Sequence, residues 1–176
     1  MQQFLLISLL CENNPTLIQA LSAACAQSQC EVVNSRISNL GQHHVGHLLA
    51  GGSWSALAKL ENQLKTLIQA HGSILQYHRT TATEYKEAAL PYVVQIIGVN
   101  TPTLLNTVLD FFMQQELNLS DIAIQQYATA QTNTAMLSIQ ANILIPANLH
   151  LAHIRESFIV FCDEQNLEAI FEPDRN

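Results

Sequence analysis

The residues with the clearest chemical potential lie at two turns in which a proline follows a polar residue. The first turn reads Glu12-Asn13-Asn14-Pro15-Thr16, and the second, 87 residues further on, reads Asn100-Thr101-Pro102-Thr103. The residue before each proline, Asn14 or Thr101, can accept a hydrogen bond from the first free N–H groups of a helix. The proline itself suits the first helical position, where no N–H partner is needed. Both turns therefore predict a strand, a short loop and a helix whose positive end faces the loop.

Other side chains that could do chemistry do not form a recognisable site. On a strand, His43 and His47 would be about 13 Å apart at roughly 3.3 Å per residue, and His44 would point to the opposite face. A shared metal is therefore not expected. The chain also lacks a Gly-x-Ser-x-Gly motif, a phosphate loop and a recognisable pairing of His with Cys. Because no nucleophile and base can be named, we predict a protein that is not an enzyme and that holds no metal and no cofactor.

The four cysteines favour a structural role. They have no Cys-x-x-Cys spacing and lie inside apolar patterns. This distribution favours free buried thiols over disulfides or a zinc site. The residues are Cys11, Cys25, Cys30 and Cys162.

The segments that position the two turns follow the same order in both halves of the chain, which indicates two copies of one unit. Alternating apolar residues predict strands, and a 3.6-residue apolar period predicts helices. Within residues 30–40, for example, Val33 and Ser35 would face one way and Val32 and Asn34 the other. The first half then contains strands at 4–10, 30–40, 43–50 and 74–80 and helices at 15–28 and 53–71.

The second half repeats this pattern, with strands at 92–99, 117–128, 136–145 and 167–171 and helices at 102–115 and 148–165. Residues 81–90 show no consistent apolar face and are interpreted as a linker. We therefore predict two domains, 1–80 and 91–176, joined by the linker 81–90. Each has the order βαββαβ, which is typical of an antiparallel four-stranded sheet with two helices on one face. The predicted fold class is α+β, with two ferredoxin-like units in tandem.

Charge and hydropathy limit the partners. The formal net charge is −7, and the seven Lys and Arg residues are spread singly along the chain. Phosphate-backbone binding needs several basic side chains on one surface, and a membrane surface attracts a polybasic segment, so neither direct nucleic-acid binding nor membrane binding is expected. The apolar runs are far shorter than the roughly 20 residues that span a bilayer, and Met1-Gln2-Gln3 lacks the basic start of a signal peptide. We expect a soluble cytoplasmic protein.

The βαββαβ order with a proline at its first strand-to-helix turn resembles the ACT domain family. Several segments are more specific than the fold, and in them the tandem pair is similar to repressors of glycine cleavage system transcription. The resemblance implies a regulatory protein without its own DNA-binding element, which would bind a LysR-type transcriptional activator and restrain it in response to glycine. These segments include Val33-Asn34-Ser35-Arg36, Gly52-Ser53-Trp54-Ser55, His78-Arg79-Thr80, Ile145-Pro146-Ala147 and Phe161-Cys162-Asp163-Glu164-Gln165-Asn166-Leu167.

Both turns depart from the ACT pattern where that family meets an amino-acid ligand. ACT domains that bind amino acids usually carry Asp-x-Pro-Gly there, whereas Thr16 and Thr103 replace the glycine and Asn13 and Asn100 replace the acidic residue. The added side chain narrows the pocket mouth, while the helix N-terminus still suits a carboxylate. Two interpretations stay open, a purely structural role of the turns or retained binding of glycine or another small amino acid. The candidate ligand-binding residues are Glu12, Asn13, Asn14, Thr16, Asn100, Thr101 and Thr103.

Two functions fit these features. The first is the repressor of glycine cleavage transcription that the resemblance implies. The alternative is a sensing module that detects a small molecule, such as an amino acid, and acts on another enzyme or regulator. Either function is compatible with a homo-oligomer.

Overall fold

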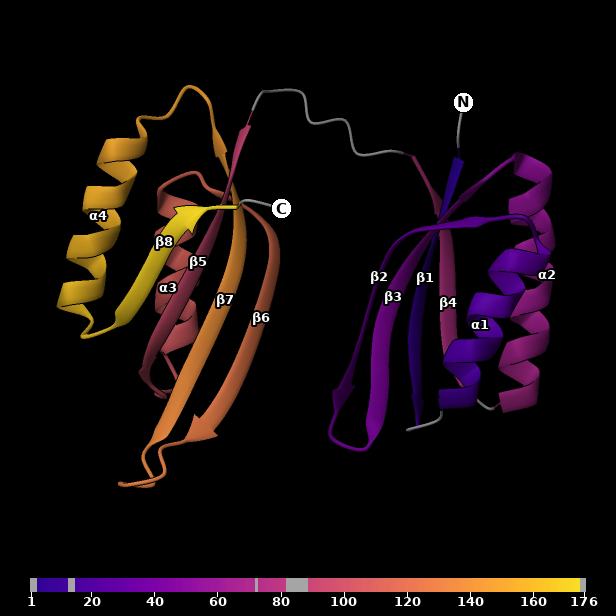
Figure 1. Cartoon of the computed structure of the whole chain (residues 1–176), viewed down its shortest axis with the longest axis horizontal. Helices are drawn as coiled ribbons and strands as arrows, with labels where there is room; N and C mark the ends of the chain where they lie inside the picture. Colours follow the sequence, from indigo (N-terminus) through magenta and orange to yellow (C-terminus); the bar gives the residue numbers. More distant parts are fainter. Residues whose placement is uncertain (1–2, 13–14, 72, 82–88, 175–176) are drawn as a thin grey trace. The chain divides into compact units, whose positions relative to one another are not determined.

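The chain divides into two compact units, Met1–Glu84 and Tyr85–Asn176. The computed structural model describes residues 3–12, 15–71, 73–81 and 89–174. Each unit contains a four-stranded antiparallel sheet with its two helices on one face, and the elements follow the order βαββαβ twice (Figure 1). The predicted fold class, two ferredoxin-like units in tandem, is confirmed. The domain limits 1–80 and 91–176 stay a prediction, and most of the predicted linker, residues 82–88, lies outside the described residues.

The first unit has the strand order β2-β3-β1-β4. Along β1, the buried residues Leu5, Ile7 and Leu9 alternate with exposed neighbours. Because successive strand side chains point to opposite faces, the buried set lies on the face covered by the helices, where it packs with Leu60 and Leu64. The elements are β1 (Gln3–Glu12), α1 (Pro15–Gln27), β2 (Glu31–Leu40), β3 (His43–Gly52), α2 (Trp54–His71) and β4 (Ile74–Thr80).

The second unit has the corresponding order β6-β7-β5-β8. Its core joins apolar residues of β5 and β7 to aromatic residues of both helices. The rings of Phe111 and Phe161 stack with their centroids 4.5 Å apart, which fixes the first helix of this unit against the second. The elements are β5 (Ala89–Val99), α3 (Leu104–Gln114), β6 (Asn118–Ala128), β7 (Ala135–Pro146), α4 (Leu151–Glu164) and β8 (Glu168–Pro173).

Both hairpins carry a β-bulge at the same place in the repeat. The register shifts between Val32 and Asn34 in β2 and between Leu119 and Asp121 in β6. A bulge adds one residue to one strand and reverses the facing of the residues beyond it. Val32 consequently shares a face with Ser35, so the strict alternation predicted for residues 30–40 is wrong at this point.

The helix starts of the second unit also differ from prediction. Helix α4 begins at Leu151 rather than at residue 148. The preceding residues form a turn in which the backbone N–H of Leu149 donates to the carbonyl oxygen of Pro146, at 3.0 Å. These residues are therefore used in the turn that connects β7 to the helix.

Candidate functional site

The first candidate loop joins β1 to α1. Pro15 is the first residue of α1, as predicted, and Thr16 follows it with an exposed side chain. Glu12 ends β1 opposite His43 and is exposed, and strand alternation places it on the sheet face away from the helices. Asn13 and Asn14 lie outside the described residues. The structure therefore places Thr16 at the helix N-terminus and Glu12 on a different side of the strand end.

The second candidate loop differs from the first. Helix α3 begins at Leu104, so the prediction that Pro102 would be the first helical residue and Thr101 its cap is wrong. The N–H of Leu104 donates to the carbonyl oxygen of Thr101 at 3.2 Å, which closes a turn before the helix. Thr103 occupies the N-cap in a helical backbone conformation (φ −97°, ψ −17°), and its side chain makes no capping hydrogen bond. Asn100 is half-buried, and its N–H donates to Ala135 on β7 at 2.9 Å.

Both helix N-termini keep their positive character. Neither α1 nor α3 has an acidic residue in its first turn. The first N–H groups of a helix have no partner within the helix, and they carry the positive end of its dipole. Thr16 and Thr103 are both exposed beside these groups. The N-termini of α1 and α3 are therefore the positive ends of helix dipoles, with an exposed threonine beside each.

Below the second loop, the protein is packed rather than hollow. A Cβ atom added to Gly98 would collide with Cδ2 of Leu167 and would lie 3.3 Å from Cδ2 of Leu104. In the first unit the same position of the repeat is Cys11, which is buried opposite His44. Glycine at 98 thus lets the first residue of α3 and the loop before β8 approach the end of β5.

A bidentate ion pair in the first unit joins α2 to β4. Nε of Arg79 donates to Oε1 of Glu61 at 2.7 Å, and Nη2 donates to Oε2 at 3.2 Å. The hydrogen bond from Arg79 holds the pKa of Glu61 below its usual range. The same guanidinium lies 5.2 Å from the centre of the Trp54 ring, which is 66% exposed. This cluster fixes the orientation of three surface side chains and leaves no group poised for acid–base chemistry.

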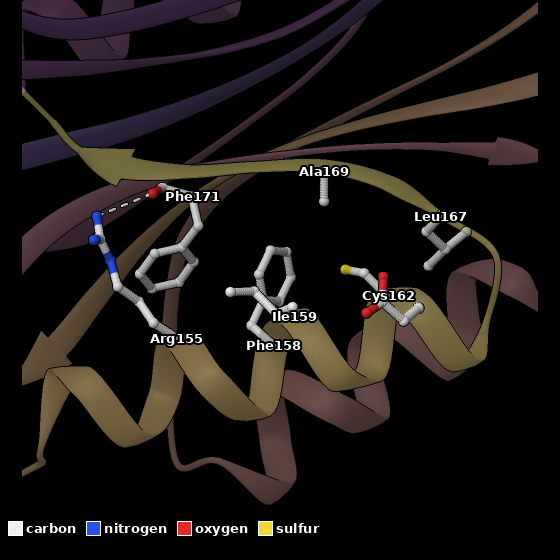
Figure 2. Close-up of a pocket in the computed structure, with 8 residues that line it drawn as sticks. Arg155, Phe158, Ile159, Cys162, Leu167, Ala169 and Phe171 are labelled. Carbon is white, nitrogen blue, oxygen red and sulfur yellow. Dashed lines mark hydrogen bonds between the residues drawn. The ribbon is translucent and has the colours of Figure 1, made fainter.

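A groove that sequence reasoning missed lies between α4 and β8 of the second unit (Figure 2). Its volume is about 330 Å³. Nη2 of Arg155 donates to the carbonyl oxygen of Phe171 at 3.3 Å, and the guanidinium lies 5.8 Å from the centre of the Phe171 ring. Burial, followed by the nearby Asp163 charge, raises the pKa of the Cys162 thiol to about 11. This α4–β8 groove is lined by Arg155, Phe158, Ile159, Cys162, Asp163, Leu167, Ala169 and Phe171.

The histidines and cysteines occupy separate positions. His44 is buried, and its neighbours His43 and His47 are exposed. The four cysteines are buried thiols outside any disulfide, as predicted. Within the described ranges, no group of three or more His, Cys, Asp and Glu side chains could hold a metal ion. In the same part of the chain, no helix combines the length and apolar character that crossing a membrane requires.

Comparison with known proteins agrees with the βαββαβ fold of the units. The ACT domain family model matches residues 3–78. Over 167 residues, the chain is 23% identical to the glycine cleavage system transcriptional repressor of Escherichia coli (strain K12), covering 95% of this chain and 88% of that protein. The repressor of the same name from Shigella flexneri is similar to the same extent.

Two crystal structures are similar to this chain across both units. One is of a protein provisionally identified as a glycine cleavage system transcriptional repressor, with a TM-score of 0.72, 22% identity and coverage of 100% of this chain and 99% of that chain. The other is of an unknown protein from Galdieria sulphuraria, with a TM-score of 0.76, 13% identity and 99% coverage of both chains. At these identities the structural likeness establishes the fold. The chain is therefore a tandem pair of ACT-like units, similar over nearly its whole length to repressors of glycine cleavage system transcription, which supports a regulatory role.

Proposed function

We propose that this protein represses transcription of the glycine cleavage system by binding a LysR-type activator in response to glycine. The observation that carries the proposal is the similarity to named repressors across 95% of the chain, which includes both ACT-like units. In the first unit the family match comes from residues 3–78. The partner and the effector are those that the resemblance implies.

The charge of the chain supports action through another protein. The net charge is −7, and its basic residues are scattered. Binding to duplex DNA depends largely on Lys and Arg contacts with phosphates. We therefore propose that contact with promoter DNA is made by the activator, and that this chain acts on the activator rather than on the DNA or on a substrate.

The two turns support sensing of a small amino acid. Each leads into a helix whose N-terminus suits a carboxylate, and Thr16 and Thr103 would reduce the space for a ligand side chain. Glycine has no side chain and suits this reduced space. Asn13 and Asn100 would supply polar contacts to the ligand, and Glu12, Asn14 and Thr101 complete the proposed set.

Thermal unfolding with glycine tests the effector. Glycine at 100 times its Kd is expected to stabilise the fold by about 2.7 kcal/mol, and leucine is expected to have no effect. Asn100→Ala should weaken glycine binding by roughly 0.5–1.5 kcal/mol through the loss of a polar contact. Asn118→Ala is a matched control, because Asn118 lies after α3, at the opposite end of that helix from the loop. Thr103→Gly should widen the pocket and admit larger amino acids.

A promoter-binding assay tests the partner. The chain alone should not shift duplex DNA at physiological salt, whereas it should alter the complex formed by the LysR-type activator. If saturating glycine leaves the melting temperature unchanged both alone and with the activator, the turns are structural. If the chain fails to bind the activator in a pull-down but still responds to glycine, the alternative of a sensing module for another enzyme or regulator is favoured.

A further inference from the structure

The α4–β8 groove has the character of a small-molecule site. Its volume of about 330 Å³ lies in the range of about 300–1,000 Å³ that ligand pockets occupy. Its walls combine apolar side chains, including Phe158, Leu167 and Phe171, with polar surface in nearly equal share. Figure 2 shows Arg155 at one end of the groove and Leu167 near the other, with Ala169 between them on β8.

The first unit shows why this groove is open. Leu75 pairs with Leu9 on β1, and Ala169 pairs with Ile96, which is the residue of β5 that matches Leu9 in the repeat. Leu75 is 7% exposed and belongs to the core of its unit, whereas Ala169 is exposed. The second unit therefore carries a smaller, exposed side chain at the position where the first unit buries a leucine.

The surface beside the groove also differs from the matching surface of the first unit, because an apolar residue stands in place of a charged one. Helix α2 buries Leu64 and follows it with exposed Lys65, whereas α4 buries Phe158 and follows it with Ile159, which is 60% exposed. The second unit thus replaces a charged position by an apolar one at the rim of the groove. An apolar rim beside a hollow lined partly by aromatic and aliphatic side chains and partly by polar groups favours a ligand with an apolar body and a polar group.

The charged residues near the two ends of the groove favour one orientation of an anionic ligand. Arg155 has five N–H donors, of which one is used by the carbonyl of Phe171. Among the described residues no carboxylate forms an ion pair with Arg155, so further donors are available. Asp163 also lines the groove, eight residues later on α4 and therefore about 12 Å along the helix axis. A ligand anion is attracted to the Arg155 end and repelled from the Asp163 end.

We propose that the α4–β8 groove binds a small apolar monocarboxylate, with its carboxylate at Arg155 and its branched or aromatic body over Ala169. Guanidinium pairs well with a carboxylate, and the rings of Phe158 and Phe171 provide the apolar contact. None of the residues that line this groove belongs to the two strand-to-helix turns. The chain would then carry an input besides the proposed glycine response.

Titration of the full-length chain with 3-phenylpropanoate, followed by amide NMR, tests this proposal. Saturable shifts should appear at millimolar concentrations and cluster at residues 155–171. Ala169→Leu should weaken binding at least tenfold, because leucine fills the space. Arg155→Gln should weaken binding of the acid by about tenfold or more, the effect of losing a charged hydrogen bond. 3-Phenylpropan-1-ol should bind more weakly than the acid and should be insensitive to Arg155→Gln.

Lys65→Gln is the matched control, because it removes a basic side chain from the corresponding helix of the first unit. It should leave the affinity for 3-phenylpropanoate unchanged. The NMR spectrum of each variant also reports whether the fold is intact. The proposal is overturned if no saturable shifts occur at residues 155–171, if they persist in Ala169→Leu, or if acid and alcohol bind equally well. None of these outcomes depends on glycine or on the activator.

Discussion

Filling the α4–β8 groove should stabilise the second unit. Ala169→Leu places in β8 the residue that β4 carries at Leu75, where the same fold buries it to 7% exposure. The groove volume of about 330 Å³ accommodates three additional carbon atoms without displacing the helix. The converse change, Leu75→Ala, opens the first unit at the matching position.

The magnitude follows from burial. Each buried methylene contributes about 0.8 kcal/mol, so three carbons contribute at most about 2.4 kcal/mol. Ordering the leucine side chain costs about 0.5–1 kcal/mol, which leaves a net stabilisation of about 1–2 kcal/mol. For a unit of this size, each kcal/mol corresponds to about 4–8 °C in melting temperature. Leu75→Ala should instead cost about 2–5 kcal/mol, because it leaves a cavity in the core.

Two probes separate the units. The chain has one tryptophan, Trp54, which lies in the first unit, so its fluorescence follows the unfolding of that unit in Leu75→Ala. Amide NMR signals of β8 follow the second unit in Ala169→Leu. A loss of stability of more than about 1 kcal/mol in Ala169→Leu, typical of overpacking, would refute the reasoning, because it would mean that the groove does not offer the space that Leu75 occupies.

Two further perturbations test the chemistry and packing of the cores. Burial raises the pKa of Cys25 and of Cys162 from 9.0 to about 11. At pH 8 the thiolate fraction of these cysteines should therefore be about 100-fold lower in the folded chain than in the unfolded chain. Iodoacetamide should alkylate them correspondingly slowly in the folded chain. The folded pKa of each thiol lies above the unfolded one, so burial of the neutral thiols contributes to stability. That contribution is complete below pH 9 and is lost as the pH rises toward 11. Denaturation at pH 8 and at pH 10.5 would detect the loss as a lower free energy of unfolding. Gly98→Ala should destabilise the second unit by about 1–3 kcal/mol, because the new methyl group collides with Leu167; if Leu167→Ala in the same chain fails to recover part of the loss, the collision is not the cause.

The repeat made most of the fold predictable. The limits of β4, 74–80, agree with prediction, and Pro15 begins α1 as expected from its fixed φ and missing N–H. Pro102 is likewise followed by a threonine and two aliphatic residues, yet it precedes the helix because the N–H of Leu104 bonds to the carbonyl oxygen of Thr101 and closes a turn first. The choice between a helical start and a turn depends on how the loop packs, which local sequence does not encode.

The β-bulges and the α4–β8 groove could not be predicted from the sequence, for a related reason. Val33 in β2 carries no feature that marks an inserted residue, and only its pairing with β3 reveals the shift. Ala169 is visible in the sequence, but its meaning depends on the strand register that aligns it with Leu75. Side-chain pattern predicts elements, whereas a cavity results from residues that meet only after those elements have paired.

The open groove sets the two units apart in a way that stability does not explain. The first unit shows that this fold accepts leucine at the position of Ala169, and the second unit instead leaves Ile159 60% exposed beside an unfilled hollow. Leaving that hollow open forgoes about 1–2 kcal/mol of stabilisation. Departures from the most stable packing concentrate at functional sites. The difference between the units therefore favours binding at the α4–β8 groove over a passive structural role for this part of the second unit.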